Sequence, residues 1–369
     1  MIYPLLPTFL ATSLAAGPAA LGLIEGIAES TASLLKVLSG LWSDRLRVRK
    51  PLVTAGYSVS SVARPLIGLA GSWVGVLALR FADRIGKGIR TSPRDALIAE
   101  ATPRELLGAA FGFHRSMDHA GAVLGPLIAA ALLGAGLSLR GVFLLAAVPS
   151  AAVLLVLALG VREAPRALAE RRRGAGTRQE RLSPGFRRLL ASTVLFTLGN
   201  STDAFLLLRL GKAGVPASGV ALLWSAHHVV KMASTYYGGR LSDGWGRKPL
   251  LLAGWLYYAA VYAGFAFFDS TAALIVLFLA YGVYYGLTEP VVGAWAAELS
   301  PGGLRGRAYG YYHGAVGGAA LPASLLFGFL WNAWGMEAAF LTGSALALAA
   351  SGVLLGVPAK SRDRSRGTA

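Results

Sequence analysis

The sequence contains no cysteine among its 369 residues, and this absence excludes several kinds of site. Disulfide bonds, thiolate metal sites and cysteine nucleophiles all require that side chain. The five histidines show no H-E-x-x-H spacing, and the chain has no G-x-x-x-x-G-K-[ST] loop for a nucleotide. No nucleophile, base and orienting group stand together in an enzyme-like pattern. We therefore expect no enzyme activity, no bound metal or cofactor, and no direct use of ATP.

Charged residues are also scarce, at 14% of the chain, against about 25% in an average soluble domain. Hydrophobic residues make up 55%, and the mean hydropathy is +0.57. Apolar runs of roughly 20 residues recur, the length that a helix needs to cross a bilayer. The sequence predicts an all-α integral membrane protein with helices over 1–14, 18–43, 51–70, 73–99, 106–134, 140–160, 188–210, 218–241, 248–268, 271–297, 305–332 and 337–357.

The basic residues give the expected orientation. The net charge is +17, and the arginines and lysines gather in alternate connections between apolar runs, with Arg140 and Lys212 as exceptions. This pattern follows the positive-inside rule and does not indicate a nucleic-acid partner. We expect a bacterial inner-membrane protein with both termini and the long middle loop in the cytoplasm.

An internal repeat divides the chain. Seven residues recur at an offset of 198, since Ala99, Glu100, Pro103, Leu106, Gly108, Ala110 and Gly112 return as Ala297, Glu298, Pro301, Leu304, Gly306, Ala308 and Gly310. Parallel halves of this kind occur in secondary transporters, with the substrate site between them. We predict six-helix bundles over 1–160 and 188–357, a basic cytoplasmic linker over 161–187 and a cytoplasmic tail over 358–369.

The repeat also bears on the first helix. The second half opens near Arg188, so the matching position of the first half lies upstream of Met1. The remaining apolar residues are fewer than the ~20 needed to span a bilayer. We expect either a start codon further upstream or a truncated first helix.

Two loops carry the same motif. The sequence reads GLWSDRLRVRK from Gly40 to Lys50 and GRLSDGWGRK from Gly239 to Lys248. Both resemble the cytoplasmic motif G-x-L-x-D-x-x-G-R-K of the major facilitator superfamily, although the first copy has an extra residue and Arg47 in place of glycine. The resemblance covers the whole chain and implies a twelve-helix transporter. It also implies a gating role for seven residues: Gly40, Asp44, Arg45, Gly239, Asp243, Gly246 and Arg247.

The fifth predicted helix contains GAVLGP, from Gly121 to Pro126. This stretch is similar to the helix-five motif of the superfamily's antiporters, although alanines replace the motif's last glycines. Gly121 and Gly125 share a helix face, and Pro126 removes one backbone hydrogen bond and favours a bend. The resemblance favours antiport and efflux.

The fourth predicted helix carries an unusual stripe of charge. Seven residues fall within an arc of roughly 140° on a helical wheel: Arg80, Asp83, Arg84, Lys87, Arg90, Arg94 and Asp95. The stripe is ~21 Å long at 1.5 Å per residue. Each charge facing lipid at mid-membrane would cost at least ~2.5–3.5 kcal/mol. We therefore expect the stripe to face a wet cavity, opposite charges, or both.

Two interpretations of this stripe remain open. In one, the cations bind an anionic substrate, because arginine offers paired donors to carboxylate or phosphate. In the other, the charges pair among themselves and hold helices together. The candidate substrate-binding residues are Arg80, Arg84, Lys87, His114 and Arg115.

The expected mechanism is alternating access driven by an ion gradient, most simply of protons. Proton coupling needs a membrane-buried titratable group, and the candidates are Asp118, Asp83, Glu25, Glu29, Asp203 and Glu289. We predict a monomer that exports a small organic solute, anionic or amphiphilic. Proton-coupled uptake of an organic anion is one alternative, and a non-transporting receptor or assembly partner with the same fold is another.

Overall fold

The computed structural model describes residues 5–15, 18–46, 49–161, 182–300 and 302–357, and this part of the chain is helical with no strand. The helices of the first half are α1 (Leu6–Ser13), α2 (Pro18–Leu46), α3 (Lys50–Leu66), η2 (Ile67–Leu69), α4 (Trp73–Ala101), η3 (Arg104–Leu106), α5 (Leu107–Gly134), α6 (Leu139–Leu145) and α7 (Ala147–Gly160). Those of the second half are α8 (Pro184–Gly199), α9 (Ala204–Lys212), α10 (Ala217–Trp245), α11 (Arg247–Phe267), α12 (Thr271–Glu298), η4 (Gly302–Leu304) and α13 (Arg305–Leu355).

The predicted seventh helix, 188–210, is not continuous and needs correction. α8 begins earlier, at Pro184, where the hydroxyl of Ser183 caps the helix by accepting from the N–H of Phe186. It ends at Gly199, and α9 resumes only after Asp203. Broken spans are common in transporters, where polar residues at the break line a cavity.

Two other predicted spans also differ in form. α6 and α7 together cover the predicted 140–160 helix, with Ala146 between them. α13 joins the last two predicted helices across Gly335, whose φ of +91° marks the turn between them. Glycine adopts this conformation readily because it has no Cβ.

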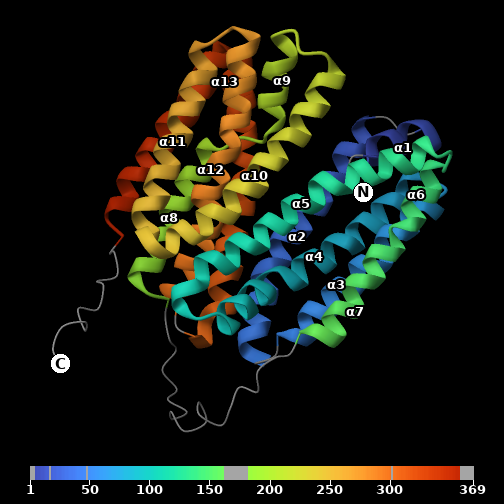
Figure 1. Ribbon diagram of the computed structural model, residues 1–369, viewed down its shortest axis with the longest axis horizontal. Helices are drawn as coiled ribbons and strands as arrows, with labels where there is room; N and C mark the ends of the chain where they lie inside the picture. Colours follow the sequence, from blue (N-terminus) through green and yellow to red (C-terminus); the bar gives the residue numbers. More distant parts are fainter. Residues whose placement is uncertain (1–4, 16–17, 47–48, 162–181, 301, 358–369) are drawn as a thin grey trace.

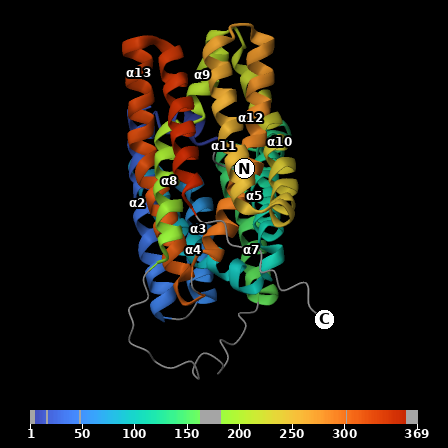
Figure 2. The same cartoon turned by 90° about the vertical axis from the view of Figure 1, so that its left-hand side faces the viewer.

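The two halves form separate helical bundles that meet at one end. Figure 1 shows α5 and α10 side by side near the bottom of the view and diverging toward the top. α2 and α13 form the second seam between the bundles, and Figure 2 shows this side of the molecule. We call the end that carries the α4–α5 and α10–α11 connections the closed end, and the opposite end the open end.

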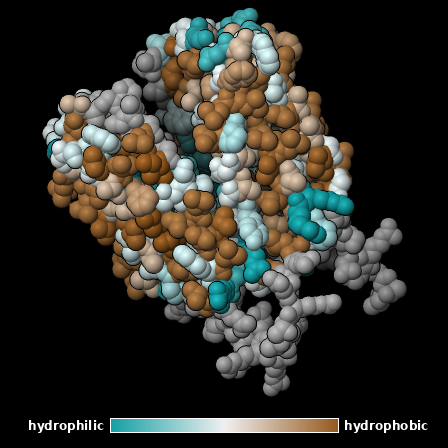
Figure 3. Space-filling model, turned by 180° about the vertical axis from the view of Figure 1, so that it is seen from behind, coloured by the Kyte–Doolittle hydropathy of each residue, from teal (hydrophilic) through white to brown (hydrophobic). Residues whose placement is uncertain are grey.

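Apolar side chains cover the outside of both bundles. Leu34, Leu159, Leu222 and Phe267 are each at least two-thirds exposed. Figure 3 shows a mainly hydrophobic surface with a hollow between the two lobes, in which hydrophilic residues are visible. Among the described residues, five helical segments are long and apolar enough to cross a membrane by composition alone. An apolar exterior around a polar interior is the arrangement that a bilayer requires.

The largest buried core lies in the carboxyl bundle and is aromatic. Phe196 of α8 stacks on Trp255 of α11 with ring centroids 4.8 Å apart, and Tyr258 meets the same ring edge-on at 4.8 Å. Such ring pairs contribute about 0.5–1.5 kcal/mol beyond the area they bury. These contacts tie α8 to α11 inside the carboxyl bundle.

Candidate functional site

Two carboxylates join the bundles at the closed end. Asp44 of α2 accepts hydrogen bonds from the backbone N–H of Gly306 and of the residue that follows it, at 2.9 and 2.6 Å. Asp243 of α10 accepts from Gly108 and its successor at the start of α5, both at 2.8 Å. Exposed N–H groups and the helix dipole favour an anion at the amino end of a helix. We call these two contacts the latches.

Arginines hold the latch carboxylates in place. Arg49, which is fully buried, lies 3.3 Å from Asp44, and Arg247 lies 2.7 Å from Asp243. Gly246, the residue between α10 and α11, has a φ of +96°, which favours glycine. Arg45, the remaining basic residue of the predicted gating set, is exposed in the last turn of α2.

Glycines let the helices of the two bundles touch at the latches. A Cβ on Gly40 of α2 would overlap the carbonyl oxygen of Gly306 in α13, and a Cβ on Gly239 would overlap that of Gly108. Small residues permit this close backbone approach between membrane helices. The closed end is therefore sealed by backbone contact as well as by the latches.

The charges of α4 do not form one surface, because their partners lie on different helices. One group turns toward α3. Asp83 accepts a hydrogen bond from Arg64 Nε of α3 at 2.8 Å and lies 3.5 Å from Arg80. Arg90 donates to the hydroxyl of Ser60 at 2.5 Å. Arg80, Asp83 and Arg90 are all buried, so this group ties α3 to α4 inside the amino bundle.

A second group surrounds one carboxylate of α2. Glu29 lies 3.6 Å from Lys87 Nζ, 3.8 Å from Arg84 Nε and 3.9 Å from Lys36 Nζ. The Glu29 side chain is 53% exposed, whereas those of Arg84 and Lys36 are largely buried. We call these four residues the Glu29 cluster. Within it three cations face one anion.

α5 carries the other predicted binding residues. Arg115 Nη1 lies 3.6 Å from Asp118 and His114 Nδ1 lies 3.8 Å from it, all on α5. The carboxylate of Asp118 is about half exposed. These contacts place two candidate binding residues around one candidate coupling residue.

The carboxyl bundle contributes a polar network at the break between α8 and α9. The carboxylate of Asp203 lies 3.1 Å from Lys231 Nζ and accepts from the hydroxyls of Tyr281 and Tyr285, both at 3.1 Å. The ammonium of Lys231 also sits over the ring of Tyr285, 3.6 Å from its centroid. The break in the seventh span thus places Asp203 among donors from α10 and α12.

Among the described residues, three further polar side-chain pairs connect the two bundles away from the latches. Asp95 of α4 meets His313 of α13, at 2.7 Å. His119 of α5 meets both His228 of α10, at 3.3 Å, and Glu289 of α12, at 3.5 Å. Polar residues of the two halves are therefore in direct contact inside the molecule.

Comparison with known proteins identifies this architecture. The sequence profile described as the Major Facilitator Superfamily matches residues 1–211 and, separately, 189–369. An uncharacterized MFS-type transporter of Methanocaldococcus jannaschii is 36% identical over 362 residues, which cover 96% of this chain and 89% of the relative. The chain belongs to the major facilitator superfamily. It is therefore a membrane transporter and not an enzyme.

Other similar proteins are more distant in sequence. An uncharacterized protein of Mycobacterium tuberculosis is 28% identical over 332 residues, covering 88% of this chain and 80% of its own length. The structure of the human organic anion transporter MFSD10 matches with a TM-score of 0.77 at 19% identity over 94% of this chain and 88% of its own. The proton:xylose symporter XylE matches with a TM-score of 0.79 at 18% identity, over 92% and 86%. The predicted fold class, two six-helix bundles in tandem, is confirmed.

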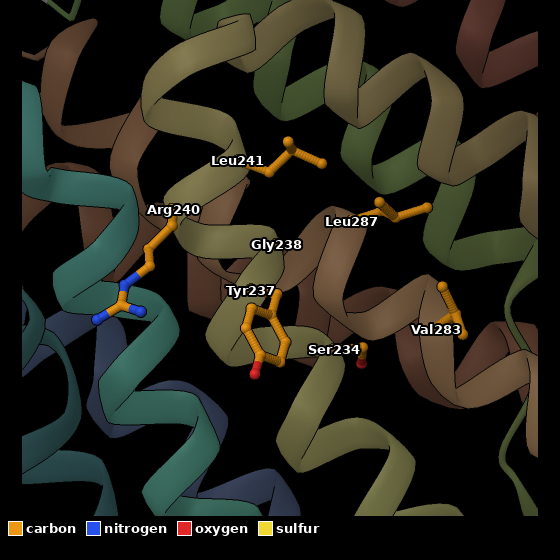
Figure 4. Close-up of a pocket in the computed structure, with 7 residues that line it drawn as sticks. All are labelled: Ser234, Tyr237, Gly238, Arg240, Leu241, Val283 and Leu287. Atoms are coloured by element: carbon orange, nitrogen blue, oxygen red, sulfur yellow. The ribbon is translucent and has the colours of Figure 1, made fainter.

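The major facilitator bundles also contain grooves away from the Glu29 cluster. Gly121 and Gly125 of the predicted bend motif line a groove of about 400 Å³ together with residues of α3 and α7. α5 stays helical through Pro126. A groove of about 510 Å³ lies between α10 and α12 on the outside of the carboxyl bundle, and Figure 4 shows its mainly apolar lining. Neither groove includes a residue of the Glu29 cluster.

For several predicted residues, the sequence did not indicate which side chains they contact. Arg64 was not predicted to hold Asp83, and Lys36 was not assigned to the binding set. The contacts of Asp95 and His119 with the other bundle were also missed. Glu25 lies in α2, but its side chain falls outside the described part of the chain. The described residues bring no three His, Asp or Glu side chains together as a metal site.

Proposed function

We propose that this transporter exports a small organic anion from the bacterial cytoplasm in exchange for protons. In this assignment the closed end faces the cytoplasm, because the basic residues gather in the connections at that end. The proposed binding residues are Arg84 and Lys87, with Lys36 joining them. Of the other predicted binding residues, Arg80 lies against Asp83, and His114 and Arg115 lie against Asp118. The fold similarity does not choose a cargo, since the same architecture serves an organic anion transporter and a proton:xylose symporter.

The Glu29 cluster is the observation that supports an anionic cargo. Its three cations are all within 4 Å of one carboxylate, and they come from two helices, α2 and α4. Three cations gathered around one half-exposed carboxylate would attract an incoming carboxylate, sulfonate or phosphate, and the guanidinium of Arg84 would offer it paired donors.

Alternating access follows from the latches. In the described conformation the open end admits solutes to the hollow and the latches seal the other end. Breaking both latches and separating the glycine contacts would expose the same cluster to the cytoplasm. Discrete rearrangements of packed elements of this kind are how transporters change state.

The test is transport by purified protein in proteoliposomes, with radiolabelled p-aminohippurate as the anionic probe. Antiport predicts accumulation of the anion in liposomes with an acidic lumen, whichever way the protein is inserted. Arg84→Ala should reduce the initial rate by about tenfold or more, since a lost charged hydrogen bond is worth ~1.5–3 kcal/mol. Arg240→Ala, which removes an exposed arginine on α10, is the matched control and should leave the rate unchanged.

Three outcomes would contradict the proposal in different ways. Accumulation only in liposomes with an alkaline lumen, beyond the level in protein-free liposomes, would indicate proton-coupled uptake instead. Equal rates for the wild type and Arg84→Ala would remove the support for the cation cluster. Absence of flux for a panel of anions and neutral solutes would favour the receptor alternative.

A further inference from the structure

Two contacts between an acid and an imidazole cross the seams of the molecule. Asp95 of α4 and His313 of α13 meet at 2.7 Å, and Glu289 of α12 and His119 of α5 meet at 3.5 Å. In each case the acid and the histidine belong to opposite bundles. Neither contact lies in a loop motif, so both are additional to the latches.

The internal repeat relates these two contacts. Glu289 and His313 follow Asp95 and His119 at the same offset of 194 residues, four fewer than the repeat's offset of 198. Four residues are about one helical turn, or ~6 Å. Both members of the Glu289–His119 pair are therefore displaced by one turn toward the open end. Each seam thus contains one contact between an acid and an imidazole, and the two contacts lie at different depths.

The two pairs differ in their surroundings. The carboxylate of Asp95 is 3% exposed and also accepts two hydrogen bonds from Arg94, which fix its position. The carboxylate of Glu289 is 32% exposed. Its Oε2 and the facing Nε2 of His119 are buried atoms that make no hydrogen bond within the described part of the chain. The second pair is thus the looser one.

A second histidine completes the looser site. The Nδ1 atoms of His119 and His228 lie 3.3 Å apart, a distance at which one of them donates a proton and the other accepts it. One further proton on this pair would place two N–H groups face to face. A second proton would make both rings imidazolium, and the two cations would then repel each other across the α5–α10 seam. Other charged or titratable groups near this site are Arg115 and Asp118 on α5, His227 and Lys231 on α10, Tyr285 on α12, and Asp203 at the α8–α9 break.

We propose that His119, His228 and Glu289 form the proton-coupling site of this transporter. Protons arriving from the open end are taken up by this cluster, weaken the contact between α5 and α10, and so favour opening of the closed end. The Asp95–His313 pair is a structural bridge in the opposite seam. The assignment of the direction of transport rests on the proposed function, but the protonation-driven separation of the seam does not.

The absence of cysteine makes the test direct. Spin labels at Glu105→Cys and Trp245→Cys, two exposed positions on opposite bundles at the closed end, report their separation by electron–electron double resonance in lipid nanodiscs. We expect the separation to increase as the pH falls. His119→Gln and His228→Gln should each abolish this pH-dependent increase. His313→Gln, in the other seam, is the matched control and should retain it.

Each result either supports or overturns the assignment. A pH response in His119→Gln and His228→Gln equal to that of the parent protein would overturn it, and so would a loss of the response in His313→Gln as well. Glu289→Gln serves as a second variant, and an unchanged distance distribution at alkaline pH verifies that each variant is folded. No cargo is present, so failure here together with anion flux in liposomes would refute the coupling site alone.

Discussion

The carboxylate of Asp243 accepts a hydrogen bond from the backbone N–H of Gly108 at 2.8 Å, which links the carboxyl bundle to the first turn of α5. The two residues are 135 positions apart in the chain. Because Gly108 has no Cβ, α10 lies against α5 closely enough for this bond to form. The polar latch and the glycine contact therefore stabilise the same conformation.

Removing this latch should shift the molecule toward opening of the closed end. Asp243→Ala loses a side-chain cap on α5, an interaction worth about 1 kcal/mol. We expect the ratio of open to closed populations at this end to rise roughly fivefold. Spin labels at positions 105 and 245 measure it. Asp269→Ala removes an acid at the open end and should not change the ratio. An unaltered ratio in Asp243→Ala would show that the latch contributes nothing to closure.

The glycine contacts predict that the same substitution has different effects at two positions of α5. A Cβ on Gly112 of α5 would meet the carbonyl of Thr235 in α10, whereas a Cβ on Gly121 would meet nothing within 4 Å. Gly112→Ala should therefore prevent full closure and lower the transport rate several-fold, because overpacking of this kind costs about 1–3 kcal/mol. Gly121→Ala should transport at the normal rate. Similar rates for the two variants would contradict the close seam.

The sequence predicted the parts of this fold that follow from local pattern. Runs of apolar residues set the number and approximate positions of the spans, and the loop motifs with Asp44 and Asp243 predicted contacts at one end. The repeat offset predicted two bundles. These features depend on nearby residues or on similarity between the halves, so they can be predicted from one sequence alone.

The partners of the charged residues could not be predicted from local sequence pattern. The helical wheel places Asp83 and Arg84 on one broad stripe, yet Asp83 turns to Arg64 and Arg84 to Glu29. Which neighbour lies beside each part of the stripe is decided by helix packing over distant segments. The break after Gly199 was missed for a related reason. Asn200 and Asp203 interrupt an apolar run only weakly, and their hydrogen bonds come from other helices.

The ion pair between Lys231 and Asp203 in the carboxyl bundle predicts that a second substitution restores stability lost by the first. Lys231→Met should lower stability by about 3 kcal/mol or more, because it leaves the carboxylate of Asp203 without its ammonium partner. Adding Asp203→Asn should restore most of that loss, since the amide needs no counter-charge. Thermal unfolding of the purified variants in detergent measures both effects. A double variant as unstable as Lys231→Met would mean that the two side chains are not coupled.

Glu29 is expected to compete with the cargo for the three cations. Glu29→Gln removes the negative charge and leaves the cations in place, so anionic probes should bind more tightly, by about threefold to tenfold in a partly exposed site. Equilibrium binding of labelled p-aminohippurate gives the affinity. Glu337→Gln, on α13 away from the cluster, is the control. Weaker binding in Glu29→Gln would show that the carboxylate assists the cargo instead of competing with it.

The most direct test of the account is the dependence of transport on the charge of the cargo. p-Aminohippurate and its neutral carboxamide have nearly the same size and differ by one negative charge. In proteoliposomes with an acidic lumen, the wild-type protein should accumulate the anion. An excess of the neutral carboxamide outside the liposomes should not inhibit this uptake. If the neutral compound is carried or competes as well as the anion, the cations around Glu29 do not select the cargo, and the central claim is wrong.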